Sequence, residues 1–173
     1  MLYAAYGSNL HPFRLQQRTP SAHLLGTAAV SDMALKFHKR GYRDSSGKCN
    51  IVKSDRSRIF VAIYDVAPAE IALLDRYEGA GSGYDRTVVT VEKFGDCVTY
   101  IATPAHINER LRPFSWYKAL VVAGCERLAF PSYYTEQIRS VAAIVDKKRD
   151  RHAEQMQLVA YCLKTARRVR QKE

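Results

Sequence analysis

The sequence has few cysteines, and they stand far apart. Cys49, Cys97, Cys125 and Cys162 are separated by 48, 28 and 37 residues, so no C-x-x-C pair or Cys/His ligand spacing occurs. The five histidines form no i, i+4 pair either. Both absences argue against a metal site, because zinc and related ions need such spacings.

Long apolar runs are also missing. The longest, such as Ala119 to Gly124, fall far short of the ~20 residues that cross a bilayer. Met1 to Leu10 has no basic segment typical of a secretory signal. We therefore expect no membrane partner, reduced and partly buried thiols, and a cytoplasmic location.

The composition is that of an ordinary soluble domain. The chain has 173 residues, of which 47% are apolar and 25% charged, which excludes a disordered chain and a fibrous repeat. No internal repeat or linker divides it. We expect one compact domain over residues 1–147, with residues 148–173 as a basic, helical extension of that domain.

Positive charge is in excess, with 27 Lys and Arg against 17 Asp and Glu, a net of +10. The last 27 residues hold nine of the basic and three of the acidic residues, so more than half of the surplus lies there. A basic cluster at Arg167, Arg168, Arg170 and Lys172 raises nucleic-acid binding as a function. Cations at a helix C-terminus also complement the helix dipole, and this solvated-face interpretation is favoured over a nucleic-acid partner.

Hydrophobic periodicity and turn residues predict strands in the first part of the chain and helices in the last. This order favours an α+β domain. The predicted strands cover residues 2–6, 33–38, 59–66 and 84–101, with a turn at Gly95-Asp96. The predicted helices cover 11–18, 67–78, 114–127, 131–147 and 150–170, and residues 39–48 form a polar, mobile loop.

The segment Tyr6-Gly7-Ser8-Asn9-Leu10 is the first candidate site. A glycine directly after a strand allows a sharp turn that leaves successive N–H groups free. A helix starting just beyond would favour an anion there. The alternative is a plain turn in which Ser8 or Asn9 caps the next helix. The spacing matches neither a Walker A nor a G-x-G-x-x-G motif.

Glu78 is the second candidate. Ala67, Ile71 and Leu74 define the apolar face of the predicted helix, and Glu78 follows at the next i+4 position. Burial and the negative end of the helix dipole would both raise the pKa of this carboxyl, which suits a general acid or base. The alternative is a frayed helix end with Glu78 in water. Downstream, Ser82 lies outside a G-x-S-x-G elbow, so a serine hydrolase is not favoured.

Together these segments resemble the γ-glutamylcyclotransferase family, also grouped with AIG2-like proteins. The family's Y-G-S-N-L stands at Tyr6 to Leu10 after Tyr3-Ala4-Ala5, and its Arg-x-Pro-x-Ala element at Arg18 to Ala22. L-D-x-x-E-G stands at Leu74 to Gly79, followed by Gly83-Tyr84. Tyr117-Lys118 and Leu128 to Tyr133 match two later helix starts. The resemblance covers about residues 2 to 145.

The resemblance implies a mixed, barrel-like β-sheet with surrounding helices, to which the C-terminal helix is added. It also implies a reaction in which the α-amine of a small γ-glutamyl compound attacks its own γ-carbonyl and releases 5-oxoproline. Glu78 would be catalytic and move the proton. Substrate binding would fall to Tyr3, Ala4, Ala5, Tyr6, Gly7, Ser8, Asn9 and Tyr117, mainly through backbone N–H groups of the turn.

No cofactor or metal follows from this reaction, and we expect a monomer or homodimer. The alternative is a non-catalytic member of the same fold that binds a small molecule or a protein, although the retained Glu78 argues against it. Because Tyr6 to Asn9 and Glu78 include no basic residue, we expect the charge surplus to describe the surface and not the site.

Overall fold

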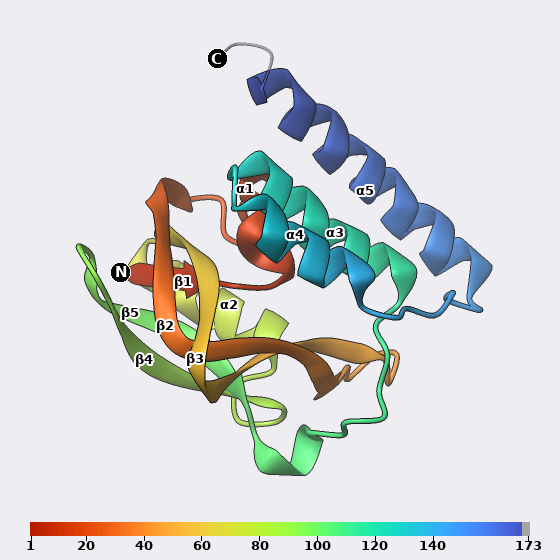
Figure 1. The fold of residues 1–173 in the computed structure, drawn as a ribbon, viewed down its shortest axis with the longest axis horizontal. Helices are drawn as coiled ribbons and strands as arrows, with labels where there is room; N and C mark the ends of the chain where they lie inside the picture. Colours follow the sequence, from red (N-terminus) through yellow and green to blue (C-terminus); the bar gives the residue numbers. More distant parts are fainter. Residues whose placement is uncertain (171–173) are drawn as a thin grey trace.

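The computed structural model describes residues 1–170, with side chains described through residue 165. Its centre is a five-stranded mixed sheet in the order β2-β3-β1-β5-β4 (Figure 1). The strands are β1 (Leu2–Ala5), β2 (His23–Arg40), β3 (Gly47–Asp65), β4 (Tyr84–Val91) and β5 (Gly95–Ala102). The α-helices are α1 (Pro12–Gln16), α2 (Pro68–Glu78), α3 (Ser115–Arg127), α4 (Ser132–Ser140) and α5 (Arg149–Arg170), and the 3₁₀ helices are η1 (Ser8–Leu10) and η2 (Pro104–His106).

Strand β1 lies in the middle of the sheet. It pairs antiparallel with β3, where Ala5 faces Ala62, and parallel with β5, where Tyr3 faces Val98. Its small apolar residues suit this position, since Ala4 and Ala5 are buried. The expected mixed sheet with surrounding helices and a C-terminal helix is confirmed. Within residues 1–170 the sheet stays open, with β2 and β4 as its edges, and is not a closed barrel.

Helix α3 connects the turn after β1 with the C-terminal helix. Its residues Leu120, Val121 and Ala123 are fully buried, and α5 lies alongside it (Figure 1). Gly124 allows α3 to approach η1 closely, because a Cβ at this position would lie 2.5 Å from Leu10 Cβ. Packing against α3 therefore fixes the turn that carries the first candidate site.

Helix α2 follows its sequence signals. Pro68 stands at its start, and Gly79 ends it in the left-handed conformation with φ 66°, as a C′ glycine does. Ile71 and Leu74 are buried. Ala67 was expected on the apolar face, but it precedes the helix and is exposed.

Several predicted boundaries are wrong; β2 and β3, for example, begin at His23 and Gly47, well before residues 33 and 59. Helix α4 ends at Ser140 and not at residue 147, because the following segment pairs with the start of α3: Ile144 N donates to Pro113 O and Ser115 N to Ile144 O. The turn between β4 and β5 precedes Gly95, which begins β5. The predicted loop 39–48 is shorter in the structure: residues 41–46 form the turn of the β2–β3 hairpin, whereas Lys39 pairs with Lys48 in its strands.

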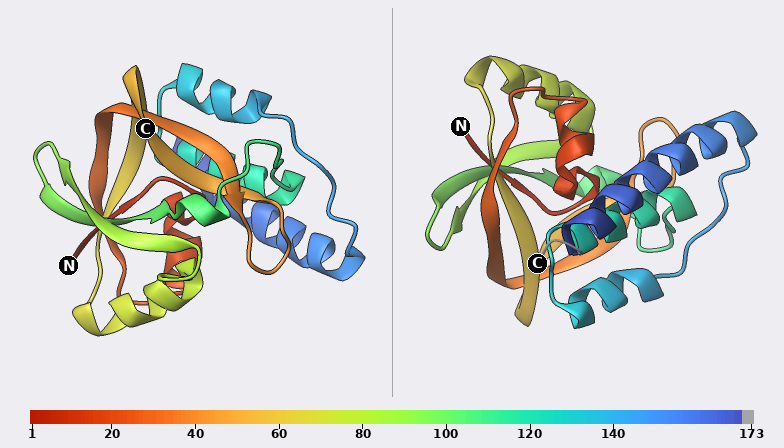
Figure 2. Two further views of the ribbon diagram at one scale, coloured as in Figure 1. Left: turned by 90° about the horizontal axis from the view of Figure 1, so that it is seen from below. Right: turned by 90° about the horizontal axis from the view of Figure 1, so that it is seen from above.

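Helix α5 covers the whole of the predicted helix 150–170, and the turn of the β2–β3 hairpin reaches toward its first half (Figure 2). Val159 and Cys162 of this helix are buried. The side chains of the basic cluster at Arg167, Arg168, Arg170 and Lys172 lie outside the described part of the chain. None of the helices described within residues 1–170 has the length and apolar character needed to span a membrane.

Candidate active site

The turn after β1 presents backbone donors. Gly7 precedes η1, Leu10 N donates to Gly7 O at 3.0 Å, and no side chain caps this helix. The first N–H groups of a helix have no partner within it. Residue His11 occupies the N-cap of α1, so the alternative in which Ser8 or Asn9 caps α1 is wrong.

Close packing also favours glycine at position 7. A Cβ there would lie 3.1 Å from Cys49 Cβ and 3.6 Å from the Tyr117 hydroxyl. The turn backbone therefore packs closely on β3, and a side chain at position 7 would require Cys49 to shift by a few tenths of an ångström. Tyr117 also lies close to the turn.

Glu78 is the last residue of α2, and that end of the helix is anchored to the sheet. The Asp75 carboxylate accepts a hydrogen bond from the Tyr100 hydroxyl at 2.8 Å and one from Arg86 at 3.0 Å. One turn of helix separates Asp75 from Glu78. These contacts hold Glu78 over the pocket.

The Glu78 carboxylate is fixed through one of its oxygens. Oε1 accepts hydrogen bonds from Asn9 Nδ2 at 2.9 Å and from Arg18 Nη1 at 3.3 Å. Oε2 has no hydrogen-bond partner among the described residues. Only 18% of the side chain is exposed, so the alternative of a carboxylate in free water is wrong. One oxygen is held by the protein and the other is free for a ligand.

An inner pocket brings together most of the predicted site. It is lined by Tyr3, Tyr6, Gly7, Ser8, Asn9, Cys49, Glu78, Tyr84, Tyr100 and Tyr117. Ala4 and Ala5, predicted as binding residues, are buried in β1 and do not line it. Cys49, Tyr84 and Tyr100 were not predicted; only Tyr84, the aromatic residue after Gly83, carried a sequence signal.

Hydrogen bonds between hydroxyl and backbone groups hold the pocket walls together. The Tyr117 hydroxyl accepts from Cys49 N at 3.2 Å, and the Tyr84 hydroxyl donates to Cys49 O at 2.5 Å. The Tyr6 hydroxyl donates to Tyr100 O. Cys49 is therefore clamped between α3 and β4.

Burial keeps these walls neutral. It raises the pKa of Tyr6, Tyr84 and Tyr117 well above that of free tyrosine, and it raises the pKa of the Cys49 thiol to about 12. A protonated thiol is a poor nucleophile. Glu78 is the one carboxylate among the described residues that line this pocket.

An outer compartment of about 470 Å³ continues the pocket toward solvent. The two spaces share Ser8, Glu78, Tyr84 and Tyr117. Arg18 and Arg151 are among its basic residues. The expectation that the charge surplus stands apart from the site is therefore wrong: Arg18 contacts Glu78 itself, and Arg151 brings charge from α5.

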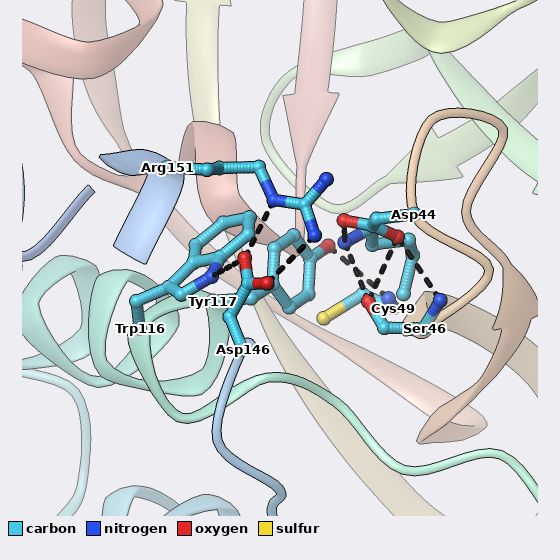
Figure 3. Close-up of polar contacts among 8 residues, drawn as sticks. Asp44, Ser46, Cys49, Trp116, Tyr117, Asp146 and Arg151 are labelled. Carbon is cyan, nitrogen blue, oxygen red and sulfur yellow. Dashed lines mark hydrogen bonds and ion pairs between the residues drawn. The ribbon is translucent and has the colours of Figure 1, made fainter. Parts of the chain in front are cut away.

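A cluster at the mouth attaches α5 to the body (Figure 3). Asp146 accepts hydrogen bonds from Arg151 Nε at 2.5 Å and from Trp116 Nε1 at 3.1 Å. Across the mouth, Lys48 Nζ donates to Asp44 at 2.7 Å and lies 4.6 Å from the centre of the Tyr117 ring. The first turn of α3 thus contacts both α5 and the β2–β3 hairpin.

The described residues contain no group of three His, Cys, Asp or Glu side chains that could bind a metal ion. The arrangement instead combines one carboxylate, a turn rich in backbone donors and neutral tyrosine walls. Such a site can bind a small polar molecule, stabilise negative charge on a carbonyl oxygen and transfer a proton.

Comparisons with known proteins agree with this chemistry. The chain is 30% identical to the γ-glutamylcyclotransferase of Mus musculus over 149 residues, which is 81% of this chain and 78% of the relative. It is 29% identical to that of Bos taurus over the same lengths. The solved structure of a γ-glutamyl cyclotransferase superposes with a TM-score of 0.79 at 23% identity, covering 93% of this chain and 98% of the other. The model of the γ-glutamyl cyclotransferase, AIG2-like family matches residues 3–119, and the chain belongs to this family.

Proposed function

We propose that the protein cyclises small γ-glutamyl compounds. The α-amine of the substrate attacks its own γ-carbonyl carbon, a five-membered lactam forms, and the original amide C–N bond breaks. The products are 5-oxoproline and the free amine or amino acid. The naming of relatives as γ-glutamylcyclotransferases supports this reaction. The main structural support is Glu78 at the pocket wall, whose Oε2 has no hydrogen-bond partner among the described residues.

Glu78 is the proposed proton carrier. The substrate amine is an ammonium at neutral pH and must lose a proton before its nitrogen can attack. Oε2 of Glu78 takes that proton, and the attacking nitrogen loses a second proton as the lactam forms. Glu78 passes one proton to the departing nitrogen, so that the amine leaves as a neutral molecule, and the other proton is released to solvent. Asn9 and Arg18 hold Oε1 and thereby aim the other oxygen.

The turn at Gly7 to Asn9 is the proposed site for the γ-glutamyl group. Attack on the carbonyl places negative charge on its oxygen, and the uncapped N–H groups at the start of η1 are suited to stabilise it. Tyr117 lies against the same turn and would contact the substrate. Ring closure within one molecule gains mainly from orientation, so the proposed step uses no cofactor.

The direct test is release of 5-oxoproline from a panel of γ-glutamyl amino acids, amines and peptides. Wild-type protein should release it from at least one, and E78Q should keep its melting temperature while its kcat falls by about 10³-fold. Glu92, exposed in the turn after β4, supplies the matched control: E92Q should keep full activity. No release from any substrate would refute the activity, and a fully active E78Q would refute the role of Glu78.

A cytoplasmic location is the second part of the proposal. All four cysteines are free thiols and buried, which fits a reducing compartment. Labelling with a thiol reagent under denaturing conditions should detect four thiols in protein taken directly from cells. Two missing thiols would indicate a disulfide and an oxidising compartment.

A further inference from the structure

Basic side chains dominate the outer compartment. Among the residues with described side chains, seven Lys and Arg line it, against the two carboxylates of Asp44 and Glu78. Three of the seven have a carboxylate partner: Arg18 pairs with Glu78, Lys48 with Asp44 and Arg151 with Asp146. The other four have no ion pair among the described residues. The compartment therefore has a surplus of positive charge that faces its interior.

Arg14 is the most unusual of the unpaired residues. It lies on α1, is only 9% exposed, and its Nε has no hydrogen-bond partner among the described residues. Burial, with a smaller contribution from the nearby Arg18, lowers the pKa of its guanidinium to about 10. A buried cation without a partner destabilises the fold, unless a ligand of opposite charge binds to it.

Lys39 adds a second such cation from β2. It is 5% exposed, and its Nζ lies 4.4 Å from the centre of the Tyr84 ring. Lys39 and Lys48 are register partners on neighbouring strands, so their side chains share one face of the hairpin. Like charges directly opposite each other destabilise a sheet, and Asp44 forms an ion pair with Lys48 but not with Lys39.

The position of the compartment indicates which part of a substrate it receives. Through residue 165, no Lys or Arg lines the inner pocket, which holds the turn and Glu78. Glu78 borders both spaces. With the γ-glutamyl group on the turn and its carbonyl at Glu78, the amine portion of the substrate extends into the basic compartment.

We propose that Arg14 and Lys39 bind carboxylates on the amine portion of the substrate, so that the preferred substrates are γ-glutamyl compounds of acidic amino acids. This inference rests on the proposed cyclotransferase function. The inference predicts that the protein prefers substrates whose amine portion carries two carboxylates over substrates whose amine portion carries one or none. Each carboxylate contributes a charge-assisted hydrogen bond to a desolvated cation.

Three substrates test this selectivity in wild-type protein: γ-glutamyl-glutamate, γ-glutamyl-alanine and γ-glutamyl-alaninamide, whose amine portions carry two, one and no carboxylates. We expect kcat/KM for 5-oxoproline release to fall about tenfold with each carboxylate lost, which is the effect of one such contact. Equal kcat/KM values for all three would overturn the inference and leave the cyclotransferase function standing.

Variants then assign the residues. K39Q and R14K should reduce the preference for γ-glutamyl-glutamate over the alaninamide by about tenfold and leave turnover of the alaninamide nearly unchanged. The control K53Q alters an exposed lysine of β3 that lines neither space and should keep the full preference. An equal loss on all three substrates would place these cations on the γ-glutamyl group and contradict the proposal.

Succinate, a dicarboxylate that cannot be cyclised, supplies a readout without turnover. Calorimetry should show succinate binding to wild-type protein and to K53Q, with at least tenfold weaker binding to K39Q. Binding with this dependence in a protein that releases no 5-oxoproline would retain the anion site and refute the cyclotransferase. Equal binding by K39Q and wild type would refute the anion site.

Discussion

Asn9 Nδ2 donates a hydrogen bond to Glu78 Oε1 across 2.9 Å and thereby joins the turn after β1 to the end of α2. The same amide lies 3.1 Å from the Tyr3 hydroxyl, and Arg18 contacts both Asn9 Oδ1 and Glu78 Oε1. The turn proposed to bind the substrate and the proposed proton carrier are therefore parts of one hydrogen-bonded unit.

The first prediction concerns that amide. N9A removes the Asn9 hydrogen bond to Glu78, so the carboxylate can rotate and Oε2 is no longer held in its orientation toward the pocket. We expect kcat for 5-oxoproline release to fall about 10²-fold, the size of effect that an error of about 1 Å in placement produces, with a smaller change in KM. Steady-state kinetics at saturating substrate will measure it.

The Asn9 amide contacts both the Tyr3 hydroxyl and Glu78. The variant Y3F removes only the first of these two contacts. Its kcat should stay within about threefold of wild type, since the contact with Glu78 survives. A Y3F variant as impaired as N9A would show that Asn9 acts through Tyr3 and not through Glu78.

The second prediction concerns Gly124. Replacing glycine by alanine within a helix ordinarily stabilises it by about 1 kcal/mol. Here the added Cβ would lie 2.5 Å from Leu10 Cβ and 3.1 Å from His11 N, so α3 and η1 must separate. We expect G124A to destabilise the fold by about 1–3 kcal/mol and to lower activity, because η1 carries the turn.

Urea unfolding will give the free-energy change for G124A, and the same preparation supplies kcat. An increased free energy of unfolding would mean that α3 and η1 tolerate the methyl group. The described close approach would then not constrain the turn.

Some of this site could be predicted because its signals are local. Pro68 and Gly79 bound α2, and the i+4 step from Leu74 places Glu78 toward the core. The turn at Gly7 is likewise predicted by a glycine that directly follows a strand. Each of these features depends on residues within a few positions of one another.

The rest of the site depends on register and on partners far along the chain. Lys39 and Lys48 stand in a polar segment that favours a loop, and only their pairing across the β2–β3 hairpin turns them toward the site. Residues 141–147 favour a helix by composition, but pairing of Ile144 with Phe114 overrides that preference. Cys49 is brought to the pocket by β3 with no local signal at all.

The third prediction concerns His11 and pH. Burial lowers the pKa of His11 to about 4, and its side chain is 2% exposed. The unfolded state, with a histidine pKa of about 6.5, therefore binds more protons between these values. The free energy of unfolding should be constant above about pH 6.5 and fall by at most about 3 kcal/mol as the pH drops to about 4.

Urea unfolding at a series of pH values will test this dependence. H11Q should flatten the profile between pH 6.5 and pH 4, because the titrating group is gone. H23Q alters an exposed histidine and should retain the wild-type slope. An unchanged slope in H11Q would assign the dependence to other groups.

The last prediction concerns the Asp146–Arg151 pair at the mouth (Figure 3). The Asp146 side chain is fully buried and Arg151 is 25% exposed; the hydrogen bond from Arg151 holds the pKa of this carboxyl well below its usual range. D146N keeps the shape and removes the charge. Because Arg151 can turn to water, we expect a loss of about 2 kcal/mol, less than the roughly 3–5 kcal/mol of a fully buried pair.

The loss should be local as well as global, because this pair attaches the start of α5 to the first turn of α3 through Trp116. Hydrogen exchange in D146N should be faster in residues 149–156 than in β1 and β3. The control D150N changes an exposed neighbour and should leave exchange unaltered. If residues 149–156 exchange at the same rate in D146N as in wild type, the ion pair does not help to hold α5. Its apolar contacts, such as that between the Phe13 and Tyr161 rings, whose centres lie 4.2 Å apart, would then suffice.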